Sequence, residues 1–154
     1  MTRRLACSLV AAVAIGCMGT SGPTVSPHVS AAQQSSASAS MGLSFPPETR
    51  FLLYHRASEK PGLVPGPDDT VHLKIELPSA VAAKFLAAHP FSEATWNAGT
   101  KRITDVPDWR EWQPSTVKTS RSSQIALPKG EALNVLVDED RPDKTIVYLV
   151  WFET

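Results

Sequence analysis

Cysteine is nearly missing from this 154-residue chain, because Cys7 and Cys17 both lie in the first 17 residues and no other cysteine follows. Everything after Cys17 therefore has no disulfide, no thiolate nucleophile, no thiolate metal site and no dithiol redox couple. The stability of the folded part must come from the packing of its core.

Charged and aromatic side chains are scarce in residues 1–42. Arg3 and Arg4 are the only charges there, whereas residues 43–154 carry the other 13 Lys and Arg, all 15 Asp and Glu, and every Phe, Trp and Tyr. The composition predicts one globular domain over 43–154, large enough to bury about two-thirds of its unfolded surface. This nearly neutral domain has no electrostatic attraction for nucleic acid, so we expect no nucleic-acid partner.

The short motifs of several enzyme classes are absent as well. The chain has no G-x-S-x-G, no P-loop, no G-x-G-x-x-G, no H-E-x-x-H and no C-x-x-C. Paired carboxylates of a glycosidase have no fixed spacing in sequence, so that chemistry stays open. No pattern predicts a cofactor, and a small domain with little cleft favours a binding role over catalysis.

A short apolar stretch follows the basic start of the chain. Met1-Thr2-Arg3-Arg4 precedes eleven mostly apolar residues over 5–15. A membrane-spanning helix needs about 20 apolar residues, so this stretch is too short to be one. The basic head and short apolar run predict an export signal peptide.

The signal peptide ends in Val13-Ala14-Ile15-Gly16-Cys17. This segment resembles the lipobox of bacterial lipoproteins, in which a small residue directly precedes an obligatory cysteine. The resemblance implies that Cys17 becomes the first residue and carries the lipid. It also implies a protein held on the extracytoplasmic side of the bacterial cell membrane or outer membrane, with secretion after cleavage near Ala31 as the alternative. Several acyl chains hold a soluble domain on a bilayer stably, where one does not.

Residues 18–42 contain seven Ser but no charged or aromatic side chain. Such a segment has too little apolar surface to offset the entropy of ordering. We expect it to be a flexible Ser- and Ala-rich tether between the lipid and the domain.

The first half of the domain predicts two paired strands and one helix. Residues 70–77 alternate apolar and polar side chains without error, as a half-exposed antiparallel strand does. Residues 51–56 predict a partner strand across a wide Pro- and Gly-rich loop. A short helix then starts at Ser79 and stops before Pro90, with an apolar stripe for packing on the sheet.

Three more strands are expected near the C-terminus, over 124–127, 132–137 and 145–152. The last is apolar on both sides, which is typical of a strand in the middle of a sheet. The sequence therefore predicts an α+β fold, a mostly antiparallel sheet of about five strands with one short helix packed on it.

The connection over 91–123 contains Trp96, Trp109 and Trp112. A structureless connection of this length is uncommon in a compact domain, so we expect short elements or a function in it. Asp108 to Trp112 predicts a single helical turn capped by Asp108. The three Trp either form an aromatic platform that binds a sugar, a peptide or a partner protein, or fold inward over the core.

Two polar clusters are candidates for metal or acid/base chemistry. Asp138, Asp140 and Asp143 place three carboxylates in six residues, which suits either a weak Ca²⁺ site or a solvated turn. His55 and His72 can approach each other across the first strand pair, with Asp68, Asp69 and Glu76 nearby, as a metal or acid/base site requires.

Taken together, these patterns predict a lipid-tethered extracytoplasmic domain that binds a protein or another cell-envelope component. The alternatives are a small hydrolase built on the His and carboxylate groups of the first strand pair, and a structural envelope protein.

Overall fold

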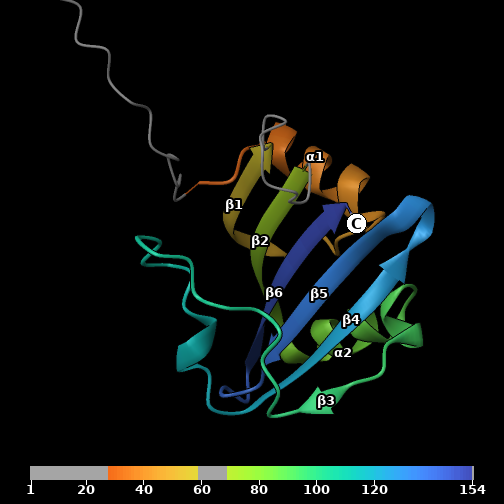
Figure 1. Cartoon of the computed structure of the whole chain (residues 1–154). Helices are drawn as coiled ribbons and strands as arrows, with labels where there is room; N and C mark the ends of the chain where they lie inside the picture. The colour runs from red at the N-terminus through yellow and green to blue at the C-terminus, as the bar shows by residue number, and fades with distance from the viewer. Residues whose placement is uncertain (1–27, 59–68, 154) are drawn as a thin grey trace, which may run out of the picture.

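The computed structural model of the chain describes residues 28–58 and 69–153. One antiparallel sheet of six strands, in the order β1-β2-β6-β5-β4-β3, forms the centre of the fold (Figure 1). The elements in chain order are α1 (Ala31–Met41), β1 (Arg50–Ser58), β2 (Asp69–Pro78), α2 (Ser79–Ala87), η1 (Phe91–Glu93), β3 (Asn97–Ala98), η2 (Pro114–Thr116), β4 (Ser120–Leu127), η3 (Pro128–Gly130), β5 (Glu131–Asp138) and β6 (Lys144–Glu153). The predicted α+β fold is confirmed, with six strands instead of five and two α-helices instead of one.

β6 occupies the middle of the sheet, as its two apolar faces predict. It pairs with β2 on one side and with β5 on the other. Its side chains enter two separate hydrophobic cores, one on each face: Val147, Leu149 and Trp151 in the first, and Ile146, Tyr148 and Val150 in the second.

Both α-helices pack on the same face of the sheet. The alternating apolar residues of β2 (Val71, Leu73, Ile75 and Leu77) meet buried residues of α1 and α2 there. The antiparallel pairing of β1 with β2 is also confirmed, with an irregularity between Phe51 and Leu53 where Leu52 is an extra residue. Such a bulge bends the strand and disturbs its outer edge.

The expected tether over 18–42 is wrong for residues 31–41, which form α1. Ala37 and Met41 are 0% and 1% exposed in the main core. The helix is fixed locally by a capping box, in which Ser30 and Gln33 bond each other's backbone N–H groups, and it ends at Gly42 with a left-handed φ of 62°. The composition of this segment predicted a flexible tether because it contains little apolar surface. The small apolar surface of its Ala and Met residues is nevertheless enough to hold the helix once it packs against the sheet.

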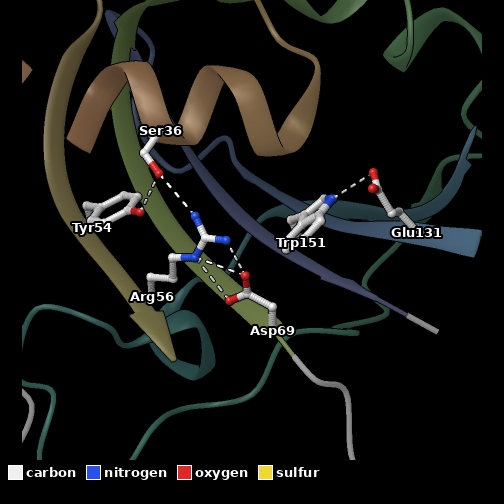
Figure 2. A network of polar contacts seen from close by, with 6 residues as sticks. All are labelled: Ser36, Tyr54, Arg56, Asp69, Glu131 and Trp151. Carbon is white, nitrogen blue, oxygen red and sulfur yellow. Dashed lines mark hydrogen bonds and ion pairs between the residues drawn. The ribbon is translucent and has the colours of Figure 1, made fainter. Parts of the chain in front are cut away.

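Side chains of β1 also bind α1. The Ser36 hydroxyl accepts hydrogen bonds from Tyr54 Oη at 3.1 Å and from Arg56 Nη1 at 3.3 Å (Figure 2). Arg56 in turn holds the carboxylate of Asp69 on β2. A chain of polar contacts therefore joins α1 to the first strand pair.

The other face of the sheet is covered by the connection between β3 and β4, which contains the short 3₁₀-helix η2 but no α-helix or strand (Figure 1). The predicted helical turn capped by Asp108 is wrong, because Asp108 has a left-handed φ of 69°. Two successive turns form instead, closed by Trp109 N to Val106 O and Trp112 N to Trp109 O. Both indoles point into the second core.

The place of α1 in the core can be tested with Met41→Ala. Removal of a fully buried Met side chain leaves a cavity, so we expect the free energy of unfolding to fall by roughly 2–5 kcal/mol. Urea unfolding measures this change. The exposed Ala32→Ser on the same helix is the control and is expected to change stability by less than about 0.5 kcal/mol. Equal stability of Met41→Ala and the unsubstituted chain would contradict the packing of α1.

Candidate functional site

The predicted lipid-attachment residue, Cys17, lies outside the described residues, as does the whole predicted signal peptide. Within the part of the chain that the structure describes, no helix is long and apolar enough to cross a bilayer.

The three Trp of the long connection do not form an exposed platform. Trp109 is 8% exposed and Trp112 is 0% exposed, and Trp112 Nε1 donates to Thr104 O at 3.0 Å. Trp96 is half-buried and stacks under the Arg121 guanidinium, whose central carbon is 4.8 Å from the ring centroid. Two of the three rings therefore seal the second core, which is the inward alternative that the sequence left open.

Two of the three aspartates around the β5–β6 turn bind backbone groups with their side chains. Asp140 accepts hydrogen bonds from Lys118 N at 2.9 Å and Thr119 N at 2.6 Å, and Asp138 accepts from Asp140 N. The bonds to Lys118 and Thr119 lower the pKa of Asp140. Asp138, Asp140 and Asp143 are not among any group of three or more side chains that could hold a metal ion, and the described residues contain no such group. The Ca²⁺ prediction is thus not supported, because the central carboxylate fixes the start of β4.

His55 and His72 do lie together, as the strand pairing requires. They are direct partners in the β1–β2 register, with ring centroids 6.3 Å apart. Trp109 covers the pair edge-on, at 4.3 Å from His55 and 5.2 Å from His72, and Trp112 lies 5.2 Å from His72. That the indoles cover this histidine pair could not be predicted from local sequence patterns, because it depends on how the connection crosses the sheet.

Burial under these indoles determines the charge of the pair. It lowers the pKa of His72 to about 4, with a smaller contribution from the nearby His55, and it also lowers the pKa of His55. The Nδ1 atoms of both rings are buried and have no hydrogen-bond partner among the described residues. Both imidazoles are consequently neutral at pH 7.

The carboxylates expected beside the histidines are held by other groups. Asp69 pairs with Arg56, and Glu76 pairs with Lys144 at 2.9 Å and with Arg50 at 3.5 Å. The hydrogen bond from Lys144 is the main cause of the lowered pKa of Glu76. Asp68 lies outside the described residues. In the described part of the chain, no carboxylate bonds either imidazole, so the acid/base group predicted from sequence is not assembled.

Two grooves lie at the outer edge of β1, and sequence reasoning missed both. Groove A, about 710 Å³, lies between α1 and the segment leading into β1. Groove B, about 610 Å³, continues around the start of β1 toward Lys74 and Glu111. Both are lined by Gln34, Thr49 and Phe51. To predict these grooves from sequence, one would first have to predict the helix α1. The Ser30–Gln33 capping box and Gly42 are the sequence features that indicate this helix.

Lys74 lines groove B and is half-buried without a carboxylate partner among the described residues, which is unusual for a cationic side chain. It is half-buried on β2, and this burial lowers its pKa. Its Nζ donates to the backbone oxygen of Glu111 at 2.5 Å and lies 4.9 Å from the ring centroid of Tyr148. No carboxylate of the described residues lies within ion-pair distance of it, although buried cations in proteins are usually paired.

No protein family model matches this chain, and no curated protein or solved structure matches it. Inferences about its function therefore rest on its own residues.

The half-buried histidine pair predicts a pH dependence of stability. Between about pH 6.5 and pH 4 the unfolded chain binds a proton at His72 that the folded chain does not, so stability falls as the pH drops through this window. We expect His72 to contribute on the order of 2 kcal/mol to this loss, after a discount for the partial exposure of the ring.

The measurement is urea unfolding at pH 7.5 and pH 4.5. His72→Gln should lose less stability between the two pH values than the unsubstituted chain, whereas His89→Gln, whose side chain is 72% exposed, should behave like the unsubstituted chain. A pH dependence that His72→Gln leaves unchanged would refute the assignment.

Proposed function

We propose that the chain is an exported, lipid-tethered binding domain on the extracytoplasmic face of a bacterial membrane. The observation that carries this proposal is the short apolar leader that ends at Gly16-Cys17, where the resemblance to the lipobox implies lipid attachment. Thiol-free sequence after Cys17 agrees with export, because no cysteine is left for unwanted disulfide exchange.

In this proposal the link between Cys17 and the domain is shorter than the composition predicted, because residues 31–41 form α1. Only residues 18–30 separate Cys17 from the first residue of α1. Thirteen residues span at most about 45 Å when fully extended. The N-terminal end of α1, which borders both grooves, is therefore the part of the domain nearest to the point of lipid attachment along the chain.

A binding role is favoured over the alternative hydrolase by the surroundings of the histidine pair. A general base needs a group that orients it and access to the proton that it removes. Here Trp109 covers both rings, and no carboxylate of the described residues bonds them. The lowered pKa of His72 comes mainly from burial, which a structural histidine also experiences. A structural envelope role remains an outcome of the tests and has no observation of its own.

The tether is tested by Cys17→Ser with Cys7→Ser as the matched control, each expressed in full length in a bacterium and fractionated. We expect Cys17→Ser to abolish partition with membranes and Cys7→Ser to preserve it, since only Cys17 follows the small residue of the lipobox-like segment. Mass spectrometry of the N-terminus should find acylated Cys17 in the control alone.

Partition with membranes that Cys17→Ser leaves unchanged would overturn the lipid tether. Release of both variants into the medium, with an N-terminus near residue 31, would instead support the secreted alternative.

A further inference from the structure

Grooves A and B adjoin each other at the edge strand β1, and we treat them together as one depression. They meet at Gln34, Thr49 and Phe51, where β1 begins. The hydroxyl oxygen of Thr49 is buried at this junction and has no hydrogen-bond partner among the described residues. Each groove falls in the size range of small-molecule sites, which is about 300–1,000 Å³.

The two ends of the depression differ in chemistry. Groove A has no charged lining residue; its apolar side comes from Phe45, Pro46, Pro47 and Phe51, and small or polar residues of α1 form the other side. Groove B adds the cations Arg50 and Lys74, together with Glu111 and His28. A groove with one apolar side and no charged lining residue therefore adjoins a groove with two cationic side chains.

The cations of groove B can accept an anionic ligand with little rearrangement. Lys74 donates to a neutral carbonyl oxygen and has no carboxylate partner among the described residues. The Arg50 side chain is 72% exposed, and its contact with Glu76 is longer than the contact of Lys144 with the same carboxylate. Loss of the Arg50 contact would leave Glu76 paired. The carboxylate of Glu111 also lines groove B and would repel an anion. It does not pair with Lys74, because Lys74 donates to the backbone oxygen of Glu111.

We propose that this depression binds an anionic single-chain amphiphile, with the acyl chain along groove A and the carboxylate or phosphate beside Arg50 and Lys74 in groove B. Apolar burial and charge-assisted hydrogen bonds would then act at opposite ends of one ligand. The proposal deepens the proposed function, because a domain tethered by Cys17 holds this depression within reach of membrane lipid.

Calorimetric titration of the full chain carrying Cys17→Ser tests the site, since no attached acyl chain can then compete. The probes are dodecyl phosphate, dodecanoate, uncharged dodecyl maltoside and inorganic phosphate, all below micelle-forming concentrations. We expect one equivalent of dodecyl phosphate or dodecanoate to bind, and dodecyl maltoside and inorganic phosphate to bind at least about tenfold more weakly. Whichever of the two anionic probes binds more tightly identifies the head group. Decyl phosphate should bind up to about 15-fold more weakly than dodecyl phosphate, as expected for two buried CH₂ groups.

Two pairs of variants locate the two ends. Lys74→Met should weaken dodecyl phosphate about tenfold or more without changing the affinity for dodecyl maltoside, and the exposed Lys84→Met is its control. Ser35→Trp should block groove A from an exposed position on α1, while Ala32→Trp, on the same helix but outside the groove lining, should not. If Lys74→Met does not fold, Arg50→Gln removes the other cation of groove B at an exposed residue and should also weaken dodecyl phosphate binding.

The site is overturned if no probe binds saturably, or if Ser35→Trp binds dodecyl phosphate as tightly as Ala32→Trp does. Equal affinity for dodecyl maltoside and dodecyl phosphate would overturn the anionic head group. Because every arm uses Cys17→Ser, these results are independent of the membrane-partition experiment, and either proposal can fail while the other stands.

Discussion

The burial of β6 on both faces is the constraint from which the rest of the fold follows. A strand with Val147, Leu149 and Trp151 on one side and Ile146, Tyr148 and Val150 on the other needs a cover on each face of the sheet. No disulfide can substitute for these covers after Cys17. The chain supplies two α-helices for one face and the connection between β3 and β4 for the other, and the histidine pair and both grooves lie where these covers meet the first strand pair.

The connection between β3 and β4 explains why two histidines are half-buried without a carboxylate partner among the described residues. Their positions follow from the alternation of β2 and the β1–β2 register, and the indoles above them come from two turns in the connection. The same connection places the Glu111 carbonyl against Lys74, so one polar contact from β2 ties this cover to the sheet. Carboxylates nearby neutralise arginine and lysine side chains instead of orienting an imidazole.

The helical cover places α1 beside the edge strand β1. Ala37 and Met41 pack on the sheet, Ser36 bonds Tyr54 and Arg56 (Figure 2), and the exposed side of the helix leaves groove A open beside β1. The bulge at Leu52 disturbs the same edge. The helix α1 therefore shortens the link between Cys17 and the domain, and it adds Ala37 and Met41 to the core. It also forms one wall of groove A, where we propose that the acyl chain of the ligand binds.

Local patterns in the sequence determined five of the six strands, all but the two-residue β3, because alternation over 70–77 and the two-sided apolar run over 145–152 specify faces directly. They also determined α2, the approach of His55 to His72, and the leader that predicts export. Only the tertiary structure decided that residues 31–41 are a helix of the core, that Trp109 and Trp112 point inward, and that Asp140 binds backbone N–H groups. Each of these features depends on a surface that residues distant in sequence supply. A weakly amphipathic helix, an indole or a carboxylate can bind several kinds of partner. The tertiary arrangement around the sheet determines which partner lies within contact distance.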